Sequence, residues 1–293
     1  MRLTKTTWVK VALIILLCLA VLGALTGGCA SVGRLWGGFG GAGSCARGSG
    51  ESLAPGGGTF TAADIDSLDV DWAAGSVTIE VVGDGADVTL AETYVGPGRQ
   101  PQTVAYVDGR TLVVDYGVTG GFMFGCAAGH KELVIQVPAS LAERLDLVSL
   151  SAASGDYALS GIRCDRLLLE QASGRTTASD VTAREMDVEL ASGAMVLGVS
   201  VSERAEFDIA SGNVEARLGG EVPHDVTASL ASGDLRLLVP DGTGFTAQVD
   251  KVSGSFESAF PCTTDGNLSI SGDGGPMHVW VTMTSGHMVI GKA

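Results

Sequence analysis

The chain has 293 residues, 45% of them hydrophobic, which is enough for one large folded core or two ordinary ones. Its formal net charge of -15 opposes binding to nucleic acid, acidic glycans and anionic lipid headgroups, because such partners are held by Lys and Arg. The 43 glycines, together with many Val, Thr and Ser, favour short strands joined by turns and predict an all-β protein.

Residues 1–32 are predicted to anchor the protein in a membrane. Arg2, Lys5 and Lys10 precede an uncharged run whose apolar part, residues 11–25, has the length of a signal peptide. The whole uncharged run could also span a bilayer, so a removable signal and a permanent helix both stay open. Because positive residues mark the cytoplasmic side, we expect the bulk of the chain to lie outside the cell membrane, attached through the N-terminus.

The anchor ends in LTGGCA, which is similar to the cleavage box of bacterial lipoproteins and makes Cys29 a candidate for lipidation. Thr26 occupies a place where that box usually has Leu. We therefore expect either an acylated Cys29 or an uncleaved helix.

A glycine-rich segment, residues 33–58, separates the anchor from the strand patterns. It lacks the period of a helix or a strand, which predicts a flexible tether. Trp36 and Phe39 could instead dip into the membrane interface, although a passive linker fits the composition better.

A single strand-rich domain is predicted over residues 59–293, with an irregular sheet over 59–140 and regular repeats over 141–293. The irregular part begins with LDVDWAAGSVTI, in which apolar residues alternate on both sides of Ala74-Gly75. This pattern looks like a first coil of the same kind as the repeats that follow.

Further strand patterns occupy residues 86–95, 103–117 and 131–138. The second is predicted to be a hairpin around the turn Asp108-Gly109. An apolar loop around Phe122, within residues 117–130, is expected to cover the open end of the fold or, alternatively, to meet a partner.

From residue 141 onward, Ser-Gly recurs about every 19 to 21 residues. Apolar residues stand six and four places before each Ser, and apolar pairs follow it. Because strand side chains alternate between two sides, each repeat is expected to be two strands around one corner. The corners are Ser154-Gly155, Ser173-Gly174, Ser192-Gly193, Ser211-Gly212, Ser232-Gly233 and Ser253-Gly254. The apolar column before them is Val148, Leu150, Leu167, Leu169, Met186, Val188, Ala205, Phe207, Val226, Ala228, Ala247, Val249, Val279 and Val281.

The corner motif suits a sharp bend. Gly tolerates positive φ, the Ser hydroxyl can bond its own turn, and Ala is small enough for the inside of the bend. A repeat has a contour of roughly 60 Å, and successive repeats would stack at about 4.8 Å, each burying the apolar face of its neighbour. The predicted architecture is a β-solenoid with coils of about 19 to 21 residues.

A column of carboxylates is predicted on the outward side, three places before the corner Ser. It comprises Glu170, Glu189, Asp208 and Asp250. Like charges in register repel, so a cation or a basic partner would stabilise them. Alternatively, the column is a solvated acidic face, partly neutralised by Arg175, Arg184, Arg204 or Arg217. Carboxylate pairs arise on any such face, so their spacing is no evidence for a glycosidase.

No sequence motif nominates a catalytic residue, a metal ligand or a cofactor site. The four His are scattered, and the sequence has no CxxC, nucleophile elbow, phosphate loop or zinc-protease motif. Asp156, Asn213 and Asp234 follow a corner glycine and could form a calcium ladder. Other residue types fill that place elsewhere, so turn capping explains them better.

Disulfides are expected outside the cytoplasm, where Cys45, Cys126, Cys164 and Cys262 would be oxidised. Three pairings are open if all four are bridged. Cys262 lies several coils beyond Cys164, too far for the Cα separation that a disulfide needs. If a single bridge forms, we predict Cys126 with Cys164.

The KELVIQVP strand, the following LDLVSLSAASGDYAL and the serial Ser-Gly repeats resemble the bacterial envelope family called putative adhesins, a domain of unknown function with β-strand repeats. The resemblance covers residues 60–291. It implies a membrane-attached, outward-facing β-solenoid, sometimes linked to envelope-stress systems, and it supplies no catalytic residues.

Three functions are compatible with these features. The first is a non-enzymatic binding or scaffolding module of the cell envelope, with an envelope protein or a glycan as partner and no nucleic acid. The second is a glycan-active β-helix enzyme. The third is an accessory of an envelope-stress sensing system, whose short cytoplasmic tail would have to signal through a partner.

Overall fold

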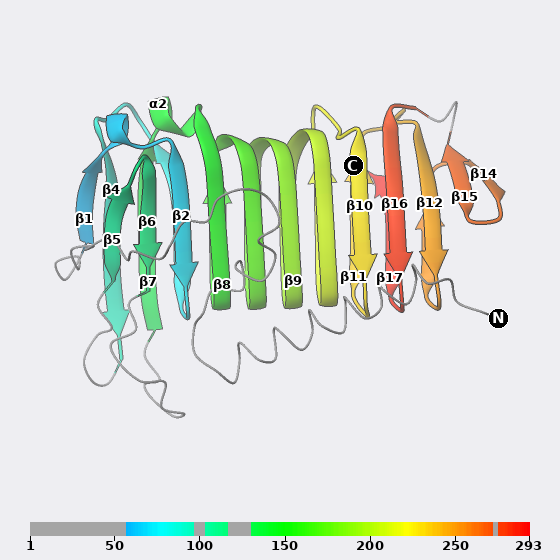
Figure 1. Ribbon diagram of the computed structural model, residues 1–293, viewed down its shortest axis with the longest axis horizontal. Helices are drawn as coiled ribbons and strands as arrows, with labels where there is room; N and C mark the ends of the chain where they lie inside the picture. Colours follow the sequence, from blue (N-terminus) through cyan, green and yellow to red (C-terminus); the bar gives the residue numbers. More distant parts are fainter. Residues whose placement is uncertain (1–56, 97–102, 117–129, 272–274) are drawn as a thin grey trace.

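The structure is a computed structural model that describes residues 57–96, 103–116, 130–271 and 275–293. Within these residues the chain is all-β apart from a 3₁₀ turn, Ala62–Asp64, and the helix α2, Ala139–Ala142. Its coils lie side by side along the long axis of the molecule (Figure 1). The strands are β1 (Gly57–Thr61), β2 (Ser67–Trp72), β3 (Ser76–Val82), β4 (Asp87–Val95), β5 (Val104–Asp108), β6 (Thr111–Asp115), β7 (His130–Pro138), β8 (Leu145–Ser160), β9 (Arg163–Leu218), β10 (Asp225–Leu230), β11 (Asp234–Val239), β12 (Phe245–Lys251), β13 (Ser255–Ser258), β14 (Cys262–Asp265), β15 (Leu268–Ser271), β16 (Met277–Met283) and β17 (His287–Lys292).

The strands form one hydrogen-bonded sheet that is wound into two layers. We call face A the layer of strands that precede the corners, in the spatial order β5, β6, β2, β8, β9, β10, β16, β12, β15, β14. Face B follows the corners, in the order β1, β4, β7, β3, β8, β9, β11, β17, β13. Strands β8 and β9 belong to both layers because they contain corners.

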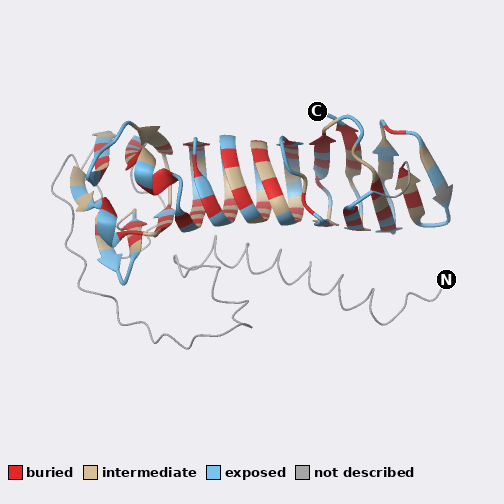
Figure 2. Cartoon of the chain, turned by 90° about the horizontal axis from the view of Figure 1, so that it is seen from above, coloured by how far each residue is buried: buried red, intermediate tan, exposed pale blue. Residues whose placement is uncertain are grey.

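The parallel register places equivalent residues of neighbouring coils side by side. Leu150 pairs with Leu169, and farther along Leu230 pairs with Ile209. Every member of the predicted apolar column is buried between the two faces, and Figure 2 shows buried and exposed positions alternating along the coils. The predicted all-β class and the predicted inward side are confirmed.

The corner glycines stack on one another along the solenoid. As predicted, φ is positive at Gly155, Gly174, Gly193 and Gly254. Gly212 and Gly233 do not have positive φ, and there the need for glycine is steric. A Cβ on Gly233 would lie 2.4 Å from the Ile209 Cγ2 atom. The same small residue therefore serves two different purposes along one column.

The corner serines tie one coil to the next. The Ser192 hydroxyl donates to the Ala172 carbonyl at 2.9 Å, and Ser173 donates to the Ala153 carbonyl at 3.2 Å. The expectation that a corner hydroxyl can bond its own turn was wrong at Ser154, Ser173 and Ser192. Stacking in register brings the Ala carbonyl of the preceding coil within reach of the Ser side chain, so the bond runs between coils.

The coils near the C-terminus are not stacked in chain order, contrary to our expectation. Strand β16 lies between β10 and β12, and β17 lies between β11 and β13. The last coil of the chain is thus inserted into the stack, and the coil of β12 and β13 becomes terminal. The hairpin of β14 and β15 covers the face A edge of that terminal coil.

The irregular N-terminal strands are hydrogen-bonded to the first regular coil, since β2 and β3 both pair with β8. The predicted hairpin forms from β5 and β6, but Asp108 pairs with Thr111, so the turn is Gly109-Arg110 and the predicted turn Asp108-Gly109 was wrong by one residue. Because Asp108 is still paired within the hairpin, the turn begins at Gly109, whose positive φ suits it.

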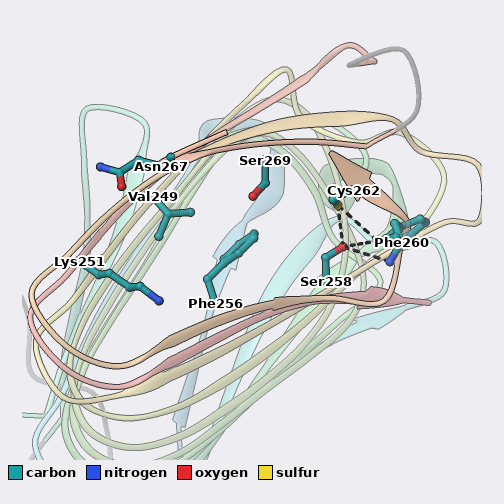
Figure 3. Close-up of a pocket in the computed structure, with 9 residues that line it drawn as sticks. Val249, Lys251, Phe256, Ser258, Phe260, Cys262, Asn267 and Ser269 are labelled. Atoms are coloured by element: carbon teal, nitrogen blue, oxygen red, sulfur yellow. Dashed lines mark hydrogen bonds between the residues drawn. The ribbon is translucent and has the colours of Figure 1, made fainter. Parts of the chain in front are cut away.

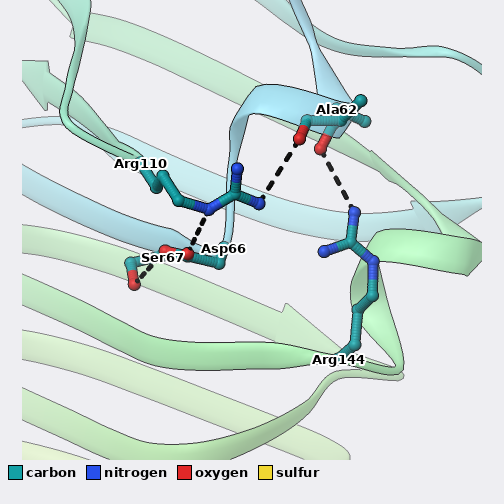
Figure 4. Close-up of polar contacts among 6 residues, drawn as sticks. Ala62, Asp66, Ser67, Arg110 and Arg144 are labelled. Atoms are coloured by element: carbon teal, nitrogen blue, oxygen red, sulfur yellow. Dashed lines mark hydrogen bonds and ion pairs between the residues drawn. The ribbon is translucent and has the colours of Figure 1, made fainter.

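Polar contacts hold this hairpin turn against the start of β2 (Figure 4). The Arg110 Nε atom lies 2.5 Å from Asp66 Oδ2, and Asp66 also accepts a bond from the Ser67 hydroxyl at 3.0 Å. Arg144, just after α2, donates to the Ala62 carbonyl at 3.4 Å. Three segments that are distant in sequence are thereby joined at one end of the coils.

Several predictions fall outside the described residues: the anchor 1–32 with Cys29, most of the tether 33–58, the loop around Phe122, and Cys126. Strand β1 begins at Gly57, within the predicted tether. Among the helices of the described chain, none has the length and apolar character needed to cross a membrane. Cys164 is buried, and its predicted bridge to Cys126 stays a prediction.

Candidate binding face

The outward side of face A carries a ladder of carboxylates on successive coils. Residues three places before the corner Ser project from the same side of the sheet, because side chains alternate along a strand. Stacking of the corners Gly174, Gly193 and Gly212 fixes the coils of β9 in register. We call Glu170, Glu189 and Asp208 the carboxylate ladder.

Burial and mutual repulsion act together on the ladder. Burial, followed by the charges of Glu170 and Asp208, raises the pKa of Glu189 to about 7. Burial likewise raises the pKa of Asp208 to about 6, although a hydrogen bond from Ser229 opposes the shift. These carboxylates are therefore costly to ionise in the free protein.

Among the residues that the structure describes, arginine side chains form ion pairs with the row of carboxylates next to the ladder, Asp187 and Glu206, and not with the ladder. Arg166 pairs with Asp187 at 2.8 Å, and Arg204 pairs with Glu206. Within the described part of the chain, no ion pair reaches Glu189. The alternative, an acidic face neutralised by arginine, thus describes only the row of Asp187 and Glu206.

The other named arginines confirm this division. Arg184 lies 3.1 Å from Glu203, away from the ladder. Arg175 pairs in register with Asp156, and Arg217 pairs with Leu238, so both lie on face B. Among the described residues, the ladder carboxylates have no ion pair, whereas Asp187 and Glu206, farther from the corners, each have one.

Asp250 does not adjoin the ladder, and its predicted place in one stack with the other three carboxylates was wrong. In the observed coil order Asp208 is followed by Ser229, then Thr282, and only then Asp250. Asp250 accepts a hydrogen bond from the Asn267 amide at 3.0 Å. The coil of β10, which has Ser229 at this position, already separates Asp250 from Asp208, and the inserted coil of β16 and β17 adds a further strand between them.

Toward the N-terminus, face A carries a second acidic group that the sequence analysis missed. Asp71 pairs in register with Asp115 on one side and with Ser151 on the other. Burial, then the charges of Asp115 and Asp69, raises the pKa of Asp71 to about 6. The signal was present, because Asp71 stands three places before Ala74 in the first coil, the place that Glu170 holds in a later one.

The predicted positions after the corner lie on face B. Asp234 pairs in register with Asn213, but Asp156 pairs with Arg175. Among the described residues, no group of three or more His, Cys, Asp and Glu side chains could hold a metal ion.

A cavity of about 390 Å³ lies at the terminal coil, beneath the hairpin of β14 and β15 (Figure 3). Ser258 stands beside Ile290 of the inserted coil, at a place where that coil has a large apolar side chain. The smaller side chain leaves space at the end of the core. The lining residues are Val249, Lys251, Phe256, Ser258, Phe260, Cys262, Gly266, Asn267 and Ser269.

The ladder predicts how stability depends on pH. Because the pKa of Glu189 is raised from 4.5 to about 7 on folding, its contribution to the free energy of unfolding should be fully present below about pH 4.5 and be lost as pH rises through 7. Glu189→Gln should flatten this decline and raise stability at pH 8 by on the order of 1 kcal/mol, since residual solvent screens the charges. Urea titrations at several pH values measure both effects.

Glu221→Gln is the matched control, because it removes one exposed carboxylate outside the ladder. A pH profile of Glu189→Gln that coincides with the Glu221→Gln profile would contradict repulsion within the ladder.

The fold and this surface define an all-β protein of stacked coils with an acidic outer face. Comparison with family models gives the particular family: the model described as Toastrack DUF4097 matches residues 65–219 and, in a second overlapping match, residues 148–290. The chain therefore belongs to this family. The resemblance to putative adhesins, a domain of unknown function, is confirmed.

Several solved structures match at low identity, among them the following three. A putative cell adhesion protein from Clostridium sporogenes is 11% identical, with a TM-score of 0.38, over 82% of this chain and 100% of that chain. A putative adhesin from Bacteroides fragilis is 10% identical, with a TM-score of 0.35, over 80% and 95%. A putative lipid binding protein from Parabacteroides distasonis is 16% identical, with a TM-score of 0.35, over 81% and 96%. The comparison with curated proteins finds no match.

Proposed function

We propose that the protein is a non-enzymatic binding module of the cell envelope, held at the membrane by its N-terminus, and that its carboxylate ladder binds a basic segment of another envelope protein. The observation that carries the proposal is the stack of Glu170, Glu189 and Asp208 on a rigid sheet, with raised pKa values on Glu189 and Asp208. A cationic partner would remove the repulsion that the free protein bears.

The geometry of the coils supports a binding role. Each coil buries its apolar columns against its neighbours, so the outward side chains stand on a backbone that is fixed by hydrogen bonds on both sides. Rigid presentation lowers the entropic cost of binding. An extended basic segment lying across the strands would meet one carboxylate about every 4.8 Å.

The proposed location follows from the predicted anchor. Positive residues before the apolar run favour export of the coils, and Cys29 offers a lipid attachment point. Mass spectrometry of the mature N-terminus distinguishes an acylated Cys29 from an intact Met1.

Binding to an oligolysine peptide tests the proposed partner chemistry. The full chain, held in nanodiscs of zwitterionic lipid, should bind the peptide at low salt and more tightly as pH rises from 5 to 8, because the ladder loses its protons. The variant Glu170→Gln, Glu189→Gln, Asp208→Asn should bind about tenfold or more weakly, as expected for three lost charge contacts. Isothermal titration measures the affinity and the linked release of protons.

A control with the same charge separates the ladder from net charge. Asp84→Asn, Asp87→Asn, Glu221→Gln removes three exposed carboxylates elsewhere and should bind nearly as the wild type does. Equal weakening in both variants would reject the ladder as the site. If Glu189→Gln with Asp208→Asn instead abolished turnover of a glycan while the chain stayed folded, the protein would be an enzyme.

A further inference from the structure

Trp280, on β16, is a large apolar side chain on the outer surface of face A. It keeps 44% of its surface exposed, whereas Val279 and Val281 beside it are buried. The ring lies 5.9 Å from the His278 ring, centroid to centroid, at an angle of 38°. An indole on the outer side of a fixed strand contributes nothing to the core, so its packing does not explain its presence.

The surroundings of Trp280 differ from the carboxylate ladder. Strand β16 lies between β10 and β12, which places Thr227 on one side of Trp280 and Gln248 on the other. Along its own strand Trp280 stands between His278 and Thr282 on the outward side. The stacked carboxylates end at Asp208, two strands away, and hydroxyl and amide groups replace them.

The apolar surface continues across the next strand of face A. Leu268, on β15, pairs in register with Gln248, and Ile270 pairs with Thr246. On this strand the usual order is reversed, because Ser269 is buried while Leu268 and Ile270 are only partly buried. We call Thr227, Trp280, Gln248 and Leu268, which form one row across four strands, the aromatic row.

We propose that the aromatic row is a binding site for a neutral oligosaccharide, separate from the carboxylate ladder. A sugar ring presents an apolar face of C–H groups, which stacks on the electron-rich face of an indole, and an edge of hydroxyls that needs donors and acceptors. Thr227 and Gln248 supply those groups on either side of the ring. A second sugar along the chain would contact Gln248 and Leu268.

The chemistry of the row favours this ligand over a cation. A site for Lys, Arg or a quaternary ammonium combines an aromatic face with adjacent carboxylates. The two register neighbours of Trp280 are uncharged, and the acidic residues nearest to it in the grid, Asp225 and Asp250, lie diagonally. Carboxylates in those places can accept bonds from sugar hydroxyls.

Titration of the full chain with neutral tetrasaccharides tests the site. The protein is held in nanodiscs of zwitterionic phospholipid, because sugar-based detergents would compete. The probes are chitotetraose, cellotetraose and maltotetraose, each compared with its monosaccharide. We expect at least one tetrasaccharide to bind, more tightly than the monosaccharide. Trp280→Ala should weaken it about ten- to a hundredfold, a loss like that caused by removing an aromatic ring that stacks on a nucleobase, while Trp280→Phe keeps part of the affinity.

Controls separate this site from folding and from the ladder. Val196→Ala changes another exposed apolar residue, on face B, and should leave sugar binding unchanged. The ladder variant should also keep sugar binding, so failure of the oligolysine experiment and failure of this one are distinguishable. The proposal is overturned if no tetrasaccharide binds the wild type, if Trp280→Ala binds as the wild type does, or if Trp280→Ala loses oligolysine binding instead.

Discussion

Gly174→Ala is expected to destabilise the protein by about 3 kcal/mol. Gly174 has φ +110, a conformation that L side chains rarely adopt, and its added Cβ would lie 2.0 Å from the Gly155 carbonyl oxygen. The obstacle is backbone of the neighbouring coil, which cannot rotate away as a side chain could. The coils would have to separate locally, with loss of the hydrogen bonds between them.

Urea unfolding of the full chain measures the effect, with Gly219→Ala as the matched control. A Cβ on Gly219 would meet nothing within 4 Å, and its φ is not positive. The control should therefore stay within about 0.5 kcal/mol of the wild type. Equal midpoints for the two variants would show that the corner stack does not require glycine.

The same residues explain how far the fold could be predicted from sequence. Alternation around each Ser-Gly gave the inward column, because a one-residue slip would turn every apolar side chain to solvent. The positive φ of corner glycines such as Gly174 was predictable from the corner motif, whereas the steric demand at Gly233 depends on Ile209 of another coil. The sequence of each repeat determines the local geometry of its corner, but the contacts between repeats depend on the order in which the coils stack.

The order of the last coils was not predictable from the repeat itself. The coil that contains Met288 and Ile290 has large apolar residues after its corner, where the coil of β13 has Phe256 and Ser258. Less apolar surface is exposed when the more apolar coil lies inside the stack and the less apolar coil lies at its end. That energetic comparison favours the observed insertion, but the frame of the repeat fits either order equally well.

The candidate sites show the same limit. Glu170, Glu189 and Asp208 could be grouped from their place in consecutive repeats. Asp250 was placed with them wrongly, because Ser229 of β10 and Thr282 of the inserted coil both lie between it and Asp208. Alternation with Val279 and Val281 is enough to turn Trp280 outward. Its neighbours Thr227 and Gln248 come from coils whose adjacency only the structure provides.

A buried ion pair lies beneath the first corner. The Lys131 Nζ atom lies 3.1 Å from Glu92 Oε1, with side-chain exposures of 0% and 2%, and it donates to the Tyr116 carbonyl at 2.8 Å. It also lies 4.8 Å from the centroid of the Trp72 ring. Burial lowers the pKa of Lys131, and the Glu92 charge opposes that shift. The position sets the edge of the corner stack, because a Cβ on Gly75 would meet the Lys131 carbonyl oxygen.

Lys131→Ala is expected to cost about 3–5 kcal/mol, because it leaves the Glu92 carboxylate buried without its ammonium partner. Lys131→Met with Glu92→Leu should recover most of that loss, since two apolar side chains of similar size require no desolvation of charge. Urea unfolding of the wild type, Lys131→Met, Glu92→Leu and the double variant gives the coupling energy between the two positions. A double variant as unstable as Lys131→Ala would contradict the role of the ion pair. The ammonium would then stabilise the first coil through the aromatic rings and the Tyr116 carbonyl, more than through its pairing with Glu92.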